Sequence, residues 1–381
     1  MPRPALRPMR ALPLLEPRRA ELEKCVFCPK LCRSACPVSN AEPRETITPW
    51  GKMSAAWMSA HGDTALDRSH AAPAWACTGC FGCREACDHR NPVTEVLLDA
   101  RDALVRSGAA PESATRVLAR FPQHDAETRA AARALASDAR CDARSTNALL
   151  VGCGYLHRAP RETKDALEAA TRICKGSVAI VEACCGLPLR LAGDVRGFAR
   201  HANHVASELA RYARVVVVDA GCALTLRQRF PEAGAPLLPR VELLVEAAAR
   251  MLPQLSAVPR DTGGPVRWHD PCQLGRGLGV YEAPRAILAR ALGRAADEFD
   301  DRREYAVCSG AGGLLPSTMP EVAKHIADAR LEAHALAGGG RVVTACASSL
   351  VAMRKSARGS GVQVDDLVTW IAGSLRHRAI G

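Results

Sequence analysis

CVFCPKLCRSACP (residues 25–37) and CTGCFGCREAC (residues 77–87) decide the fold, because each places four cysteines close together. The second stretch spaces them C-x2-C-x2-C-x3-C. In this pattern three neighbouring thiolates bind one 4Fe-4S cubane and the fourth binds an adjacent cubane. Two such stretches therefore predict two clusters. A structural zinc site would need two ligand pairs separated by a longer loop, and a disulfide framework would need an oxidising compartment.

The exchange of the fourth thiolate predicts which cysteines share a cluster. One 4Fe-4S cluster is expected on Cys25, Cys28, Cys32 and Cys87, and the other on Cys77, Cys80, Cys83 and Cys36. Pro37 follows Cys36 in the usual way, whereas Asp88 follows Cys87. Because nearby negative charge disfavours the addition of an electron, Asp88 should make the neighbouring cluster harder to reduce.

Length and composition limit the remaining possibilities. A chain of 381 residues should hold two or three domains. The formal net charge of +11 would fall to about +7 with two cubanes bound. No long basic run is interleaved with aromatic residues, so no nucleic-acid partner is expected. The positive net charge is better explained by a basic face that binds an acidic redox partner.

The first segment, residues 1–20, is rich in proline and arginine and is expected to be a disordered basic tail. Its apolar part is too short for the core of a signal peptide. No apolar run in the sequence is long enough to span a membrane. We therefore expect a cytoplasmic protein, in which free thiolates can bind metal, with peripheral association at the inner membrane face as an option.

Residues 21–110 are expected to form an α-helical ferredoxin domain. Apolar residues recur at helical spacing at 53–60, and a second helix is expected over 94–108. The long segment between the two cysteine stretches favours helices over a compact β-containing ferredoxin. Residues 111–146 are rich in alanine, arginine and acidic residues, which predicts a helical connector.

From residue 147 the pattern changes to alternating strands and helices, which predicts parallel sheets. Three expected strands, ALLVGC, SVAIVEACC and VVVVDAGC, end in cysteine. The carboxyl ends of parallel strands meet at one edge of a sheet, so their cysteines should converge. These are Cys153, Cys184, Cys185 and Cys222, candidates for a third iron-sulfur cluster in repeat 1, residues 147–255. At any single position, a cysteine packed as a small apolar residue is the alternative.

The same plan recurs in residues 256–381, the second repeat. GPVRWHDPC, YAVCSGAGG and RVVTACASS are its expected strands, and they carry Cys272, Cys308 and Cys346. This repeat is degenerate, because CCG at 184–186 becomes CSG at 308–310, with Ser309 in place of cysteine, and ASS at 347–349, which ends in Ser349, lacks a cysteine; we therefore expect a lid and docking surface. Its three cysteines remain candidate ligands. His269 is a candidate ligand or proton donor, with a neutral, hydrogen-bonded histidine as the alternative.

This combination resembles the iron-sulfur subunits of glycolate oxidase, lactate utilisation proteins, anaerobic glycerol-3-phosphate dehydrogenase and heterodisulfide reductase. The resemblance runs from residue 25 to about residue 375. It implies an α-helical ferredoxin domain followed by two similar α/β cysteine-rich repeats. In that family each repeat contributes the motifs C, CCG and CxxC, and here Asp219 stands at the first CxxC cysteine of repeat 1.

The resemblance implies an iron-sulfur electron-transfer subunit of an oxidoreductase complex, not a complete enzyme. Electrons would come from a flavoprotein that oxidises a 2-hydroxy acid or a similar substrate, and would leave to a quinone or another carrier. The sequence has no flavin or nicotinamide fingerprint, so hydride chemistry needs a partner. The alternative is a catalytic disulfide or heterodisulfide reductase with a cluster in the repeats. A more remote alternative is a noncatalytic redox sensor.

Overall fold

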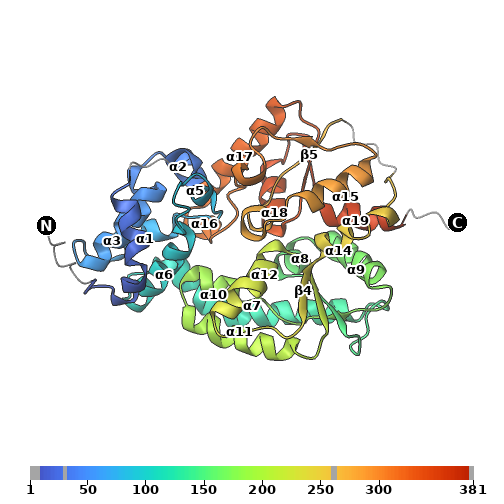
Figure 1. The fold of residues 1–381 in the computed structure, drawn as a ribbon, viewed down its shortest axis with the longest axis horizontal. Helices are drawn as coiled ribbons and strands as arrows, with labels where there is room; N and C mark the ends of the chain where they lie inside the picture. Colours follow the sequence, from blue (N-terminus) through green and yellow to red (C-terminus); the bar gives the residue numbers. More distant parts are fainter. Residues whose placement is uncertain (1–8, 29–31, 259–263, 377–381) are drawn as a thin grey trace. The chain divides into compact units, whose positions relative to one another are not determined.

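The computed structural model describes residues 9–28, 32–258 and 264–376, which divide into two compact units. The first unit comprises residues 1–121, 188–197 and 307–327. The second comprises residues 122–187, 198–306 and 328–381. The expected fold class is confirmed, because a helical N-terminal region precedes two α/β regions, each with a parallel four-stranded sheet (Figure 1).

Helices build most of the first unit. Its longer helices are α1 (Arg19–Val26), α3 (Pro49–His61), α6 (Val93–Arg106) and the start of α7 (Glu112–Ala136). Its shorter helices are α2 (Pro37–Ala41), α4 (Arg68–Ala71), α5 (Gly82–Glu85) and α16 (Leu315–Thr318), with 3-10 turns η1 (Pro13–Arg18), η2 (Arg33–Ala35), η3 (Glu45–Ile47) and η4 (Ala72–Trp75). The two helices expected from apolar spacing are present as α3 and α6.

Local sequence explains both ends of α3. Thr48 Oγ1 accepts a hydrogen bond from Gly51 N over 3.0 Å and so caps the first turn. Pro49 suits the first helical position because its missing N–H would have no partner there. Gly62 ends the helix at φ 78°, where a side chain would be strained. The buried face of α3 includes Met53, Ala56 and Ala60.

The expected disordered tail is wrong from Met9 onward. Met9, Leu12 and Leu15 are at most 3% exposed and belong to the same apolar core as α3 and α6. The reason is that burying these side chains offsets the entropy lost on ordering the segment. Residues 1–8, which make up the rest of that prediction, lie outside the described residues.

The second unit contains two parallel sheets with strand orders β2-β1-β3-β4 and β6-β5-β7-β8. The first sheet consists of β1 (Asn147–Leu150), β2 (Ala179–Ile180), β3 (Arg214–Val217) and β4 (Arg240–Leu243). The second consists of β5 (Val266–Trp268), β6 (Asp297–Glu298), β7 (Arg341–Thr344) and β8 (Gln363–Asp366). Leu149 of β1 pairs with Ile180 on one side and Val216 on the other, which fixes the register. The shared order agrees with the duplication expected from the sequence.

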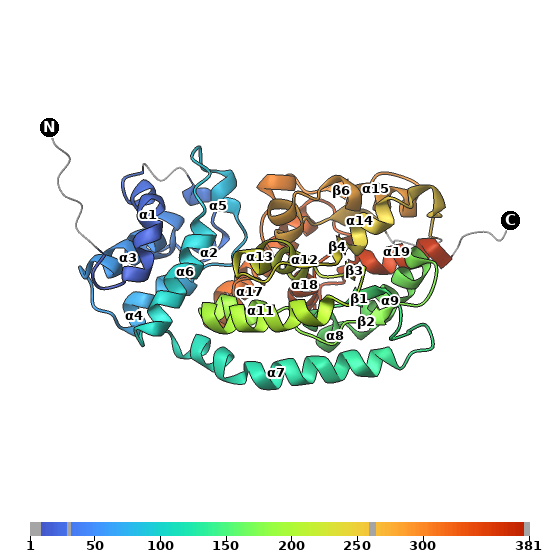
Figure 2. The same cartoon turned by 60° about the horizontal axis from the view of Figure 1, so that its bottom comes forward.

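Helices accompany the strands of both repeats. In the first repeat they include α8 (Cys153–Arg158), α9 (Pro160–Cys174), α10 (Leu187–Ala192), α11 (Val195–Leu209), α12 (Ala220–Leu224), α13 (Phe230–Glu232) and α14 (Leu244–Ala249). In the second they include α15 (Glu282–Leu292), α17 (Pro320–Leu336), α18 (Ala347–Ser356) and α19 (Leu367–Arg376). The later part of α7 lies beside α11, to which the ion pair of Arg129 with Glu208 joins it at 2.9 Å (Figure 2).

One expected strand of the second repeat is wrong. Residues 305–308, YAVC, form no strand, and β6 at Asp297–Glu298 pairs with β5 instead. The guanidinium of Arg276 explains the difference, because it donates hydrogen bonds to the carbonyl oxygens of Glu304 (3.0 Å) and Ala306 (2.6 Å). These carbonyls are thereby bound to a side chain and not to a neighbouring strand. Among the described helices, none is long and apolar enough to cross a bilayer.

Candidate metal centres

Four of the N-terminal cysteines line one small cavity in the first unit. They are Cys36, which precedes α2, Cys77 and Cys80 from the loop that leads into α5, and Cys83 within α5. Burial raises the pKa of the Cys83 thiol well above its usual value, and Cys77, Cys80 and Cys36 raise it further. The shared cavity brings these four thiols together. They are the set that the exchange of the fourth thiolate assigns to one cluster.

The other four cysteines of the two stretches also influence one another. Burial raises the pKa of Cys32 to about 12, with further contributions from Cys25, Cys87 and Cys28. Burial likewise raises the pKa of Cys25 to about 11. Residues 29–31, between Cys28 and Cys32, lie outside the described part of the chain.

The two groups of cysteines receive different polar contacts. Lys52 Nζ donates a hydrogen bond to Cys36 Sγ over 3.3 Å, although Lys52 is only 2% exposed. Burial opposes the charge of Lys52, but Cys36 and Cys77 outweigh it and raise the pKa of the ammonium group. In the other group, Asn91 Nδ2 donates to Cys25 Sγ over 3.0 Å. One group thus has a buried cation as donor and the other a neutral amide.

Sequence reasoning missed both donors. A signal for Lys52 was available, since it lies within the apolar helix PWGKMSAAWMSAH, where a charged side chain needs a buried partner. Asn91 gave no comparable signal, because its position after the second cysteine stretch also suits a turn.

Arg101 of α6 is a buried connector beside Cys77. The residue is 1% exposed, and burial lowers the pKa of its guanidinium to about 10. It donates to four carbonyl oxygens, those of Ala74 (2.9 Å), Cys77 (3.2 Å), Leu191 (2.7 Å) and Gly313 (3.1 Å). Leu191 and Gly313 come from the segments that follow the CCG and CSG motifs. Gly313 lies so close to the Cys77 carbonyl that a side chain would not fit.

The four candidate cysteines of the first repeat lie together. Cys153 begins α8 after β1, Cys184 and Cys185 follow β2, and Cys222 lies in α12 after β3. Hydrogen bonds link Cys153 to Cys184, Cys184 to Cys185, and Cys185 to Cys222. The strands end several residues before these cysteines, so helix starts and a loop present the thiols, not the strands themselves.

His124 joins this group, and sequence reasoning missed it. Its Nε2 lies 3.8 Å from Cys184 Sγ, and it also hydrogen-bonds to Cys153. The donor atoms of His124, Cys153 and Cys184 all lie within 4.8 Å of one another. No local pattern in FPQHDAE marks His124 as a ligand, so the sequence predicts only a helical connector here.

Asp219 has a structural role at the same edge. Its Oδ1 accepts hydrogen bonds from Gly221 N (2.8 Å) and Cys222 N (3.2 Å), which caps α12. Its Oδ2 accepts one from Ala347 N over 3.3 Å. Burial raises the pKa of Asp219 to about 6.

The three candidate cysteines of the second repeat lie in different compact units. Cys308 belongs to the first compact unit, whereas Cys272 and Cys346 belong to the second. His269 is 1% exposed, and burial lowers its pKa to about 3. Arg330 Nε donates to His269 Nδ1 over 3.3 Å. The neutral, hydrogen-bonded histidine therefore describes His269 better than a proton donor.

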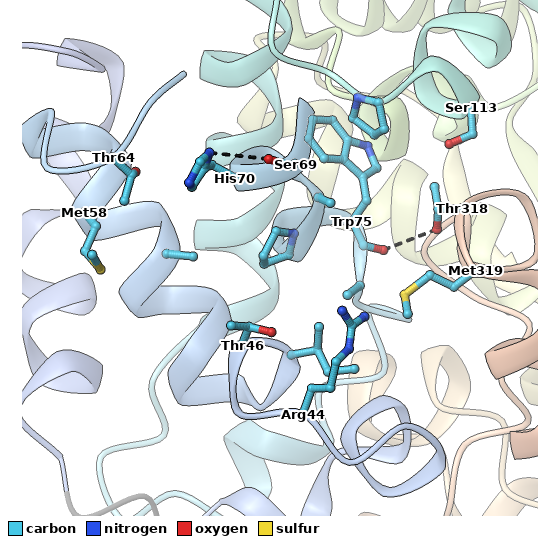
Figure 3. A pocket seen from close by; sticks show the side chains of 16 residues that line it. Arg44, Thr46, Met58, Thr64, Ser69, His70, Trp75, Ser113, Thr318 and Met319 are labelled. Carbon is cyan, nitrogen blue, oxygen red and sulfur yellow. Dashed lines mark hydrogen bonds between the residues drawn. The ribbon is translucent and has the colours of Figure 1, made fainter. Parts of the chain in front are cut away.

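A cavity of about 500 Å³ lies in the first unit next to the Cys77 loop (Figure 3). Trp75 and Ala76, the two residues before Cys77, line it together with Met58, Met319 and His70. Trp75 is 1% exposed, and within the described residues its indole Nε1 is buried without a hydrogen-bond partner. The volume falls in the range of small-molecule sites.

Comparison with known proteins identifies the two kinds of region. Residues 21–91 match the 4Fe-4S dicluster domain, and residues 147–227 and 266–354 match the cysteine-rich domain called CCG. One subunit of the dihydromethanophenazine:CoB--CoM heterodisulfide reductase from Methanosarcina acetivorans is 29% identical over 210 residues, 51% of this chain and 50% of that protein. The chain thus spans about half the length of this relative.

Two further relatives match parts of the chain. One subunit of the CoM/CoB fumarate reductase from Methanothermobacter marburgensis is 26% identical over 279 residues, which cover 71% of this chain and 55% of that protein. EtfAB:quinone oxidoreductase of Syntrophomonas wolfei is 28% identical over 141 residues, 36% of this chain and 19% of that protein. The matches confirm the resemblance to heterodisulfide-reductase-type iron-sulfur proteins.

Proposed function

We propose that this iron-sulfur protein is an electron-transfer subunit of an oxidoreductase complex. Its sequence joins a 4Fe-4S dicluster domain to two cysteine-rich domains. The observation that carries the proposal is the small cavity whose lining includes Cys36, Cys77, Cys80 and Cys83, since it brings together cysteines from both stretches. Two bound 4Fe-4S clusters would supply one-electron transfer.

The donor set fits such clusters. Buried thiols are unfavourable as free anions, and cluster iron would stabilise the thiolate form at these positions. In this proposal Cys25, Cys28, Cys32 and Cys87 hold one cluster, and Cys77, Cys80, Cys83 and Cys36 hold the other. Cys25 and Cys36 are buried in apolar clusters, and Lys52 and Asn91 direct their donors at these two sulfur atoms.

The proposed electron donor is a flavoprotein dehydrogenase, and the proposed acceptor is a quinone or a similar carrier. The cavity beside Cys77 supports the acceptor, because most of its lining is apolar and because Trp75 and Ala76, the residues before Cys77, form part of its wall. A quinone there would lie next to the cysteine loop. We also propose a cytoplasmic location, with peripheral association where the carrier is in the membrane.

The test of this function is reoxidation of the reduced chain by a short-chain quinone, followed by stopped-flow absorbance. Trp75→Phe replaces the indole in the cavity wall with a smaller ring and should slow reoxidation several-fold. Trp57→Phe is a matched control, because its indole Nε1 is also buried without a partner in the described structure but does not line the cavity. Equal rates for all three proteins would exclude this site, and a chain without reversible reduction would exclude the function.

The heterodisulfide reductase relatives favour one second candidate, reduction of a disulfide. The cap made by Asp219 and the serines at 309 and 349 weaken it, because they replace soft thiolate ligands with oxygen. Turnover of a thiol heterodisulfide with a low-potential electron donor would establish this second candidate. Electron transfer without such turnover would support the first.

A further inference from the structure

The first repeat brings two of its cysteines close to a histidine that lies outside the cysteine motifs. Helix α7 supplies His124, the start of α8 supplies Cys153, and the loop after β2 supplies Cys184. Their donor atoms lie within 4.8 Å of one another. Imidazole nitrogen and thiolate sulfur together form a donor set that suits iron and zinc.

The position of His124 is fixed by contacts on both sides of the cysteine loop. Asp125, the next residue of α7, accepts a hydrogen bond from Cys184 N through Oδ1 over 3.2 Å. Asp125 also pairs with Arg129 at 2.9 Å. From the other side, His201 Nε2 lies 2.8 Å from the Cys184 carbonyl oxygen. These contacts hold α7 against the loop that carries Cys184, and they keep the imidazole of His124 beside the thiols of Cys153 and Cys184.

The carboxylate at this edge is already engaged. Three backbone N–H groups bind the two oxygens of Asp219, and capping α12 accounts for its burial. His124 is therefore the non-cysteine side chain best placed to bind metal beside Cys153 and Cys184.

We propose that His124 is a ligand of an iron centre in the first repeat, with Cys153 and Cys184 as its nearest fellow ligands. Cys185 and Cys222 are the remaining proposed ligands, because a chain of thiol hydrogen bonds places them next to Cys184. This inference rests on the proposed electron-transfer function. Imidazole is a neutral ligand, whereas a further thiolate would add negative charge, so this centre should have a higher reduction potential than the same centre with cysteine at residue 124.

The experiment uses the full chain, produced with ¹⁵N-labelled histidine and reduced under anaerobic conditions. Pulsed electron paramagnetic resonance should detect nitrogen coupled to a paramagnetic centre. The coupling should vanish in His124→Ala and His124→Cys. It should persist in His157→Ala, a matched control whose ring centroid lies 5.7 Å from that of His124.

Iron content and potential provide independent readouts. His124→Ala should lose iron from the first-repeat centre, whereas His124→Cys should keep this iron and show a lower midpoint potential. Nitrogen coupling and iron content unchanged in His124→Ala would overturn the proposal, as would zinc or no metal at this site in the unsubstituted chain. Failure of the proposed function would appear differently, as missing N-terminal cluster signals in the unsubstituted chain.

Discussion

Lys52 donates a hydrogen bond to Cys36 Sγ across 3.3 Å inside the core of the first unit. A buried positive charge at this distance favours the more negative, reduced state of a cluster on Cys36. Cys25 receives its hydrogen bond from the neutral Asn91 instead. We therefore expect the cluster on Cys36 to have the higher reduction potential and to receive electrons from the cluster on Cys25.

Lys52→Met tests this order of potentials. Removal of a charge-assisted hydrogen bond should lower the midpoint potential of the cluster on Cys36 by on the order of 50 mV, while the potential of the cluster on Cys25 changes less. A redox titration followed by electron paramagnetic resonance measures both. Lys164→Met is the control, since it removes an exposed charge in α9. Equal shifts in the two variants would contradict the assignment to Lys52.

Cys36→Ser and Cys87→Ser test the exchange of ligands between the two stretches. Each substitution should disturb the cluster bound mainly by the other stretch, because the fourth thiolate crosses over. Iron content and the spectrum of the reduced protein report the loss. Cys141→Ser, which lies outside every candidate group, should leave both clusters intact. Disturbance confined to the cluster of the substituted stretch would rule out the crossover.

Arg101→Met should destabilise the first unit. It leaves four carbonyl oxygens without their buried donor, which should lower the free energy of unfolding by about 3 kcal/mol. Urea unfolding monitored by circular dichroism measures the loss. Arg116→Met, an exposed substitution in α7, should change stability little. A similar stability for both variants would show that Arg101 does not join these segments.

His269 should make the chain sensitive to acid. Burial lowers its folded-state pKa to about 3, below the ordinary value near 6.5. The unfolded chain therefore takes up the proton first, so stability is complete above pH 6.5 and decreases as pH falls towards 3. Between pH 7 and pH 5 this residue should account for about 2 kcal/mol. Urea unfolding of His269→Gln should show a smaller acid loss than the unsubstituted chain, and an equal loss would refute this origin.

The parts that sequence predicts well depend on short-range patterns. The spacing of the eight N-terminal cysteines and the alternation after residue 147 are local, and both the cysteine groups and the two sheets follow from them. His124 is different, because it lies 60 residues from Cys184 and meets it only through the packing of α7. No spacing rule contains that contact.

Tertiary contacts explain the two places where the prediction from sequence is wrong, the segment around Leu12 and the expected strand at residues 305–308. The segment around Leu12 reads as polar and proline-rich, yet three apolar side chains are enough to bury it in the core. YAVC has the composition of a strand, but Arg276 binds its neighbouring carbonyls and redirects the chain. In both segments, tertiary contacts override the local preference of the sequence.

Electron paramagnetic resonance of the reduced full chain, with spin quantitation, tests the central claim most directly. Two clusters held side by side by crossed ligands should give close to two spins per chain, with splittings from magnetic interaction between them. A single isolated spin, or iron for only one cubane in the N-terminal region, would contradict the electron-transfer account.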